Sequence, residues 1–312
     1  MSIELIQAIR AQSKLSISQA ISLVENQGEI GKEILSEIFK FTGEAYRIGI
    51  TGPPGAGKSS LTDQLISAFR EKNKKVAVIA IDPTSPFSGG AVLGDRIRMT
   101  KHHSDKNVYI RSMATRGSQG GLSIQAEEIG DIFDAAKFDI IIYETVGVGQ
   151  IELDIVQAAD TVLVVLVPES GDEVQMMKAG LMEIGNIFAI NKADRPGANK
   201  LNITLQNLLS TMPIDNDVWR ATVIRTIATE GKGIEDLVDN INSHHEYIYS
   251  NGMECKNFDD RYQRRLNACI NSEFQNKFWD KTKHGLLIAE LKKSQKKRLS
   301  PYLLSKKLLE NE

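Results

Sequence analysis

The sequence predicts an α/β protein with a mostly parallel sheet, helices on both faces of the sheet, and helical extensions at each end. Short apolar runs alternate with helical stretches through the middle of the chain, whereas helical periodicity alone dominates its two ends. The runs are continuously apolar, which is typical of parallel strands that are buried on both faces. We therefore expect a helical extension at 1–43, a sheet domain at 44–245 and a helical arm at 246–312.

The elements are predicted in chain order from their periodicity. Apolar residues recur at helical spacing from Leu5 to Ile38. Helical patterns return at Ile234 and in an amphipathic stretch at 257–278, and Ser300-Pro301 predicts a capped helix start. A more polar run at 218–226 predicts an edge strand. The six runs that predict buried strands are 47–51, 75–81, 107–111, 138–144, 161–167 and 187–191.

Composition excludes several classes of protein. The 312 residues carry 38 Lys+Arg against 40 Asp+Glu, a net charge of −2, which argues against binding nucleic acid or membrane through bulk charge. Only two cysteines occur, so no disulfide framework is expected. No apolar run approaches the roughly 20 residues that span a bilayer, and the N-terminus lacks a secretory pattern. We expect a cytoplasmic protein with no nucleic-acid and no membrane partner.

A phosphate-binding loop is the strongest motif. The pattern G-x-x-x-x-G-K-[ST] stands between a predicted strand and a predicted helix, where backbone N–H groups and the helix N-terminus can surround phosphates. Lys58 would reach the β- and γ-phosphates, and the Ser59 hydroxyl would bind Mg²⁺. The motif therefore predicts a P-loop nucleotide-binding site. Its expected contacts are Gly52, Pro53, Pro54, Gly55, Ala56, Gly57, Lys58, Ser59 and Ser60.

A second motif predicts that the base is guanine. Asn191-Lys192-Ala193-Asp194 follows a buried strand, and a carboxylate can accept two hydrogen bonds from N1–H and the exocyclic amine of guanine. Lys192 would lie along the base, and Asn191 would brace the loop. Ile227, Ala228 and Thr229, after the last strand, would supply backbone N–H contact to the guanine oxygen. The expected cofactors are GTP/GDP and Mg²⁺.

Carboxylates at strand ends predict the Mg²⁺ site. Aspartates beside phosphate are costly unless a divalent cation lies between them, so Asp82, Asp95 and Glu144 join Ser59 as candidate metal ligands. Loop capping is the alternative for Asp82 and Asp95. Val148 stands where a water-positioning glutamine is common, which predicts slow hydrolysis without a partner, although Gln150 is nearby.

The motifs together resemble one family. Gly-Pro-Pro-Gly-Ala-Gly-Lys-Ser, Asp-Pro-Thr-Ser, Glu-Thr-Val-Gly-Val-Gly-Gln, Gly-Asp-Glu-Val-Gln and Asn-Lys-Ala-Asp are similar to the MeaB/MMAA/ArgK family of P-loop GTPases, over roughly residues 15 to 240. The resemblance implies a SIMIBI-like P-loop NTPase fold. It also implies a homodimeric GTPase chaperone that gates adenosylcobalamin loading into methylmalonyl-CoA mutase or a related acyl-CoA mutase and protects or reactivates that enzyme.

The resemblance also assigns roles to residues. Asp172, Gln175 and Lys178 would lie in an additional switch loop that faces the mutase, and Lys178 joins Lys58, Glu144 and Gln150 as catalytic candidates. The C-terminal helices match a dimerisation arm by placement, whereas a solvated face on a packed helix is the alternative. Ile227 departs from the family's usual serine.

Three other functions stay open at this point. A nickel metallochaperone GTPase has a similar P-loop plan, but Cys255 and Cys269 lie far from the nucleotide motifs in the sequence. A P-loop kinase, the older transport-kinase label of the family, would need an acceptor site that the residues do not identify. A guanine-binding scaffold without catalysis is disfavoured by the presence of Lys58 and the carboxylates.

Overall fold

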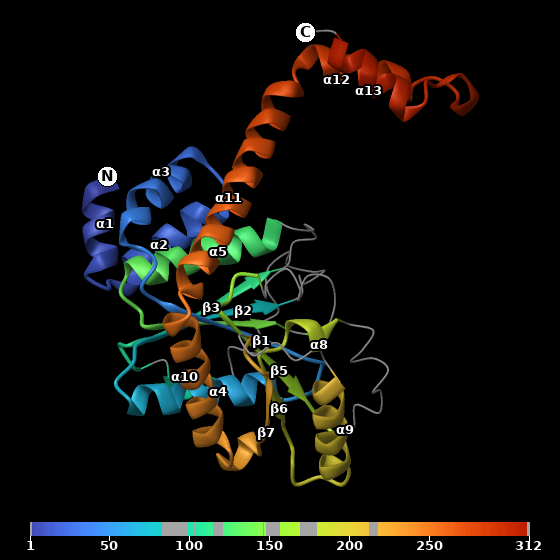
Figure 1. The fold of residues 1–312 in the computed structure, drawn as a ribbon. Coiled ribbons are helices and arrows are strands. Elements are labelled where there is room, and N and C mark those ends of the chain that lie inside the picture. Colours follow the sequence, from blue (N-terminus) through green and yellow to red (C-terminus); the bar gives the residue numbers. More distant parts are fainter. Residues whose placement is uncertain are drawn as a thin grey trace. The chain divides into compact units, whose positions relative to one another are not determined.

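The computed structural model describes residues 2–82, 99–102, 104–114, 121–145, 147, 157–168, 180–211 and 218–310. Within these ranges one sheet has seven strands in the order β3-β2-β4-β1-β5-β6-β7 (Figure 1). All its strand pairs are parallel, which confirms the predicted fold class. The strands are β1 (Tyr46–Thr51), β2 (Val76–Asp82), β3 (Val108–Ala114), β4 (Ile140–Thr145), β5 (Thr161–Leu166), β6 (Ile187–Ile190) and β7 (Thr222–Arg225).

The helices precede, cover and follow this sheet. They are α1 (Ser2–Arg10), α2 (Lys14–Glu25), α3 (Glu29–Ile38), α4 (Lys58–Glu71), α5 (Gly121–Ala135), α8 (Leu181–Ile184), α9 (Ala198–Thr211), α10 (Ile234–Ser250), α11 (Met253–Phe278), α12 (Lys281–Leu291) and α13 (Pro301–Glu310). Short 3-10 turns lie at η1 (Phe39–Phe41), η2 (Thr100–His102), η3 (Ala228–Glu230) and η4 (Gln295–Lys297). Among the helices described, none is long and apolar enough to cross a membrane.

The central strands are buried from end to end. β1 lies between β4 and β5, with Ile48 in register with Ile142 on one side and Thr161 on the other. Every residue of β1, β4, β5 and β6 is buried, because helices cover both faces of the sheet. Within the described ranges β7 pairs with β6 alone and is partly exposed, so the polar run at 218–226 does supply an edge strand.

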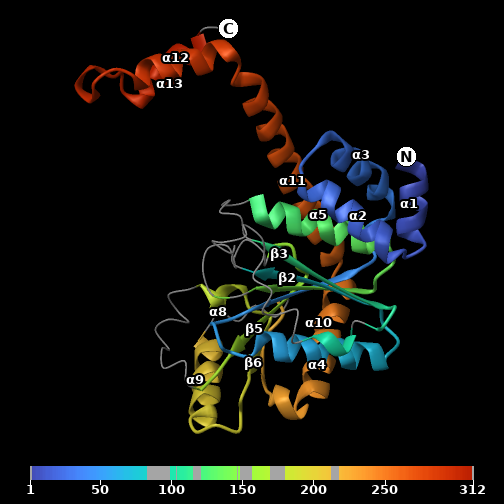
Figure 2. The same ribbon diagram turned by 180° about the vertical axis from the view of Figure 1, so that it is seen from behind.

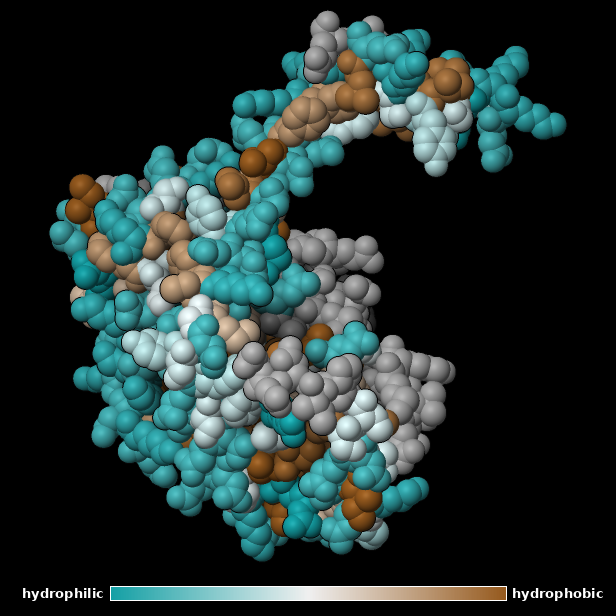
Figure 3. All heavy atoms as spheres, in the orientation of Figure 1, coloured by the Kyte–Doolittle hydropathy of each residue, from teal (hydrophilic) through white to brown (hydrophobic). Residues whose placement is uncertain are grey.

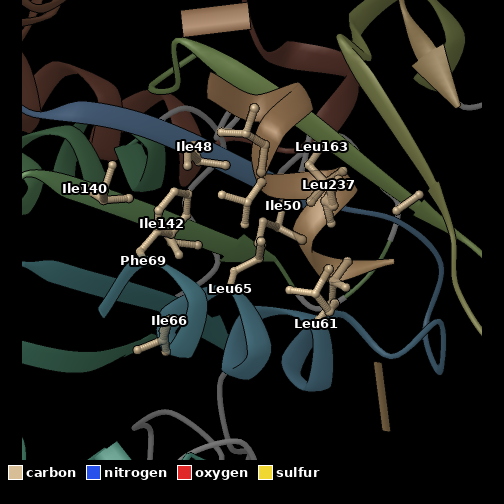
Figure 4. Close-up of a cluster of buried hydrophobic side chains, with 14 of the residues drawn as sticks. Ile48, Ile50, Leu61, Leu65, Ile66, Phe69, Ile140, Ile142, Leu163 and Leu237 are labelled. Atoms are coloured by element: carbon tan, nitrogen blue, oxygen red, sulfur yellow. The ribbon is translucent and has the colours of Figure 1, made fainter. Parts of the chain in front are cut away.

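One face of the sheet packs against α4 and α10. Leu61, Leu65 and Phe69 of α4 and Leu237 of α10 meet the apolar side chains of the central strands (Figure 4). In both ribbon views, α5 and α1–α3 lie on the opposite side of the sheet from α4 and α10 (Figures 1 and 2). Apolar side chains therefore pack on both faces of the sheet, and the loop between β1 and α4 joins a central strand to a helix on one of these faces.

The N-terminal helices are joined to the sheet by a buried ion cluster. Asp134 of α5 accepts hydrogen bonds from the backbone N–H groups of Gly43 (2.8 Å), Glu44 (3.2 Å) and Ala45 (3.1 Å). The buried Arg47 guanidinium lies 2.7 Å from Asp131 and 3.4 Å from Asp134. Burial raises the pKa of Asp134, while the Arg47 charge and the backbone hydrogen bonds oppose that shift. The cluster stabilises the entry from α3 into β1.

The chain divides into two compact units, Met1–Phe258 and Asp259–Glu312. α10 belongs to the first unit, where Ile241 and Ile248 are buried in the sheet core. The predicted boundary between 245 and 246 falls inside α10, and the division of the chain into three regions stays a prediction. α11 begins in the first unit and continues in the second.

The second unit is built from α12, α13 and the later turns of α11. α13 begins at Pro301, and the Ser300 hydroxyl accepts from the N–H of Leu303 (3.3 Å), which confirms the predicted cap. Apolar side chains recur every four residues along α11 and stay exposed, and Figure 3 shows apolar surface along this helix. They are Tyr262, Leu266, Ile270 and Phe274, which we call the α11 stripe.

Candidate functional site

The loop between β1 and α4 has glycines where no side chain would fit. Gly52 has a φ of +143°, and a Cβ there would lie 2.1 Å from the carbonyl oxygen of Val165 in β5. Gly57 has a φ of +86°, and its Cβ would lie 2.4 Å from the side-chain nitrogen of Asn191. Only glycine combines these backbone angles with such close approaches. The loop therefore has the backbone curvature that a phosphate cradle requires.

The first two helical residues after the loop carry its polar side chains. Lys58 is 5% exposed, and its ammonium donates to the carbonyl oxygens of Gly52 (2.7 Å) and Pro53 (3.0 Å). Ser59 is buried beside it at the N-terminus of α4. An ammonium held inside the loop and a helix N-terminus that points into it are both suited to anionic phosphate.

Asn191 joins three separate segments around this loop. Its side-chain nitrogen donates to the carbonyl oxygen of Ala56 (2.9 Å) in the phosphate loop. Its side-chain oxygen accepts from the N–H of Ala228 (3.1 Å) and the hydroxyl of Thr226 (3.3 Å). The phosphate loop, the N-K-x-D segment and the loop after β7 are thus held together by one buried amide.

The two loops expected to bind the base also contact each other directly. The N–H of Ala193 donates to the carbonyl oxygen of Thr226 (3.1 Å). Lys192 has a φ of +54°, a strained value for a side chain other than glycine. The pKa of Lys232 is raised, chiefly by its hydrogen bond to Glu230 and less by the charge of Asp194, so Asp194 lies near this loop. The base motif and the loop after β7 therefore form one rim.

Ile227 and Ala228 occupy the part of this rim for which backbone contact with guanine is predicted. The N–H of Ile227 donates to the carbonyl oxygen of Lys232 (3.0 Å), and the N–H of Ala228 donates to Asn191. Thr229 follows within η3. Two of the three N–H groups therefore already have partners inside the protein, and the predicted contact of this segment with guanine stays a prediction.

The candidate metal ligands are only partly described. Glu144 is 3% exposed near the end of β4, in register with Ile50 of β1 and Ala80 of β2. Asp82 ends β2 in the same sheet, at the edge from which the phosphate loop leaves. Oxygen donors such as the Glu144 carboxylate and the Ser59 hydroxyl are the ligands that Mg²⁺ prefers, so the residues present fit that ion.

Several predicted residues lie outside the part of the chain that the structure describes. They are Asp95, Val148, Gln150, Asp172, Gln175 and Lys178. The site-residue assignments stay predictions, although the structure brings the described phosphate and base motifs to one edge of the sheet.

The segment predicted to contact guanine begins at Thr226, whose own contacts the sequence did not predict. Its hydroxyl donates to the side-chain oxygen of Asn191 (3.3 Å), and its carbonyl oxygen accepts from the N–H of Ala193 (3.1 Å). A side chain whose role is to hold another loop is hard to recognise without the tertiary contacts.

Comparison with known proteins gives the chain a family. The family model described as Methylmalonyl Co-A mutase-associated GTPase MeaB matches residues 17–283. A protein of Pyrococcus abyssi assigned as a GTPase is 44% identical over 96% of this chain and 93% of its own length. The GTPase ArgK of Escherichia coli is 34% identical over 75% of this chain and 73% of its own length.

A solved structure supports the fold independently. The crystal structure titled LAO/AO transport system kinase aligns over 98% of this chain and 96% of its own, with a TM-score of 0.72. Its sequence identity to this chain is 23%, so this likeness speaks for the fold alone. The family itself follows from the sequence matches, which cover most of the chain. The chain belongs to the MeaB family of methylmalonyl-CoA mutase-associated P-loop GTPases.

Proposed function

We propose that this protein binds and hydrolyses GTP. The observation that carries the proposal is the Asn191 amide, which links the phosphate loop at Ala56 to the rim that holds the base motif. This link supports a single site that combines a cradle for phosphates with Asp194, a carboxylate suited to guanine. Membership of a family of GTPases supports the same activity.

Different residues are proposed to contact the phosphates and the metal ion. The Lys58 ammonium, which donates to the carbonyls of Gly52 and Pro53, would donate to the β- and γ-phosphates instead. The phosphates are negatively charged and therefore form stronger hydrogen bonds with an ammonium than neutral carbonyls do. Ser59 and Glu144, with Asp82 and Asp95, would hold Mg²⁺. When bound, that ion neutralises charge on the phosphate oxygens. Hydrolysis without a partner is expected to be slow because Val148 cannot orient water.

Base selection gives a direct test of the site. Replacing Asp194 by asparagine puts an amide donor where the carboxylate would accept two hydrogen bonds from guanine, so GTP affinity should fall about tenfold or more while ATP affinity stays weak. Fluorescent nucleotide titrations measure both affinities. Asp236→Asn, an exposed aspartate of α10, is the matched control. Unchanged purine preference in Asp194→Asn would contradict the assignment.

We further propose that the protein serves an adenosylcobalamin-dependent acyl-CoA mutase, as a chaperone that gates cofactor loading and protects or reactivates the enzyme. The family description, which names methylmalonyl-CoA mutase, supports this partner. Asp172, Gln175 and Lys178 are the residues proposed to face it. The experiment is GTP hydrolysis with and without a purified cobalamin-dependent mutase, with ATP as control. Stimulation with GTP alone is expected; no effect of any such mutase would count against the partner.

A homodimer formed through the C-terminal helices belongs to the same proposal. The α11 stripe supports it, since four large apolar side chains at 45–59% exposure on one helix are unusual unless another surface covers them. A second copy presents the same stripe, so the surface can pair with itself in a symmetric contact.

A further inference from the structure

The edge strand β7 directs backbone hydrogen-bonding groups away from the sheet. Within the described ranges it pairs with β6 alone. The N–H groups of Thr222 (3.4 Å) and Thr226 (2.9 Å) donate to carbonyl oxygens of β6 and of the residue before it. Because backbone groups alternate between the two sides of a strand, those of Val223 and Arg225 point away from β6. The outer side of β7 can therefore pair with a further strand.

A cavity of about 580 Å³ lies against this edge, lined by residues of β7, α9 and α10, and we call it the β7 groove. Figure 1 shows β7 between the two helices. Val223 packs in the apolar cluster that contains Leu205 of α9, and Ile224 packs in the cluster that contains Leu237 of α10. The helices therefore cover opposite faces of β7, and the groove follows the edge between them.

The two helices give the β7 groove different chemistry on its two sides. α10 lines it with the carboxylates of Asp236 and Asp239. α9 lines it with the side-chain amides of Asn202 and Gln206. Carboxylates accept hydrogen bonds and attract cations, whereas amides both donate and accept. An occupant would therefore meet negative charge on one side and neutral polar groups on the other.

Two cations lie beside these groups. Lys72 of α4 lies 3.3 Å from Asp239, with both side chains about half exposed or more, so this pair is weak. Arg225 donates to the side-chain oxygen of Asn199 in α9 (2.9 Å), which holds its charge on the α9 side. On the α10 side, two carboxylates therefore face one lysine, and negative charge remains there.

We propose that the β7 groove binds an extended peptide segment of a partner protein that carries lysine or arginine at every second position. Such a segment adds a strand to the sheet by pairing with the outward backbone groups of Val223 and Arg225. Its successive side chains point to opposite sides, so one set meets the carboxylates of α10 and the other meets the amides of α9. A second copy of this chain fits less well, because its own β7 lies between the same two helices.

The charge pattern is tested with a labelled octapeptide of alternating threonine and lysine, titrated against the full chain by fluorescence anisotropy. It should bind at least about tenfold more tightly than the same peptide with glutamate in place of lysine. Asp236→Asn combined with Asp239→Asn should weaken binding about threefold to tenfold. Glu235→Gln combined with Glu246→Gln, at exposed carboxylates of α10 outside the groove, is the matched control and should change it little.

The strand pairing is tested by two substitutions at one position. Arg225→Pro removes an outward N–H that pairing with β6 does not use, a change that an edge strand tolerates. The peptide should then bind at least about tenfold more weakly. Arg225→Ala removes the same charge but keeps the N–H, so it should bind the peptide at least as tightly as the wild type does.

N-methylated peptides test the same pairing on the wild-type protein, where misfolding of a variant cannot interfere. Methyl groups on the lysine amides alone, or on the threonine amides alone, each block one side of the added strand. One of these peptides should lose binding, whereas the other should stay within about twofold of the parent.

Equal effects of the two methylation patterns would overturn the inference, as would equal binding by Arg225→Pro and Arg225→Ala. Equal affinity for the lysine and glutamate peptides would contradict the proposed chemistry of the partner. A lower mass for Arg225→Pro than for the wild type in light scattering would assign the edge to a second copy of the chain and would overturn the inference too.

Discussion

The helices at the two ends of the chain have similar amphipathic sequences but different surroundings. α2 and α3 each bury one apolar face, with Ile17, Ile21 and Ile38 at 0% exposure. α11, every residue of which the structure describes, has no buried residue, and its stripe faces outwards. An apolar period therefore predicts that a helix forms but does not predict what covers it.

The contrast extends to charged side chains. The N-terminal extension ends at the buried cluster of Arg47 and Asp134, and Arg111 of β3 binds Glu25 of α2 (2.6 Å). In α11, Lys277 and Glu273 pair one turn apart (3.1 Å) with both side chains well exposed. Buried pairs hold segments that are distant in sequence, whereas an exposed pair within a helix adds little beyond the helix itself.

The largest effect is expected in the N-terminal extension. Ile21→Ala removes a fully buried side chain from the core that α2 shares with α5, which should lower the free energy of unfolding by about 4 kcal/mol. Urea unfolding followed by circular dichroism measures the loss. Leu15→Ala in the same helix is the control, because Leu15 is exposed and its replacement should change little. Equal losses in both variants would remove the contrast between buried and exposed positions.

The buried ion cluster should give the next largest effect. Asp134→Asn leaves Arg47 with one carboxylate and weakens the hydrogen bonds from the N–H groups of Gly43 and Ala45. The free energy of unfolding should therefore fall by about 3 kcal/mol. Glu273→Gln, which breaks the exposed pair in α11, should cost less than about 0.5 kcal/mol. The same unfolding titration compares the two. A loss for Glu273→Gln as large as that for Asp134→Asn would contradict the contrast.

A pH effect is expected at His244, where α10 meets the sheet. The ring is buried, its Nδ1 lies 2.5 Å from the Thr161 hydroxyl, Trp219 packs edge-on against it, and Tyr247 lies alongside. Burial lowers the pKa of His244 from 6.5 to about 4, with Asp160 opposing the shift and His245 adding to it. Because the unfolded chain binds this proton more tightly, stability present above pH 6.5 is lost as the pH falls toward 4.

Measurement of unfolding at two pH values tests this expectation. The loss attributable to His244 should be about 2 kcal/mol between pH 6.5 and pH 5. His244→Phe removes the titrating group, so its stability should depend less on pH over the same interval. Identical pH dependence in the variant and the wild type would show that His244 does not titrate as described.

The smallest effect on unfolding is expected from the α11 stripe. Ile270→Asp should change the unfolding of the first unit by less than about 0.5 kcal/mol, because this side chain is already exposed. It should nevertheless halve the mass measured by light scattering, since a charge at the centre of an apolar contact is costly. Lys256→Asp, an exposed charge change outside the stripe, is the control. A wild-type protein with the mass of a monomer would contradict the proposed dimer.

The local elements could be predicted because their signals are local. The continuous apolar run 161–167 predicted β5, the polar run 218–226 predicted the edge strand, and Ser300-Pro301 predicted the start of α13. The phosphate loop could be located for the same reason, since its glycines are required by backbone geometry at Gly52 and Gly57. Each of these depends on neighbours within a few residues.

The sequence by itself determined the fold class, the strand positions and the two nucleotide motifs, because burial and backbone geometry limit which residues each can contain. Only the tertiary structure decided which distant groups meet. The Asn191 amide between Ala56 and Ala228 and the contact of Asp63 with His102 join residues that are 135, 37 and 39 positions apart. Such partners are chosen by the packing of the whole chain, and a polar side chain carries no local sign of which one it will find.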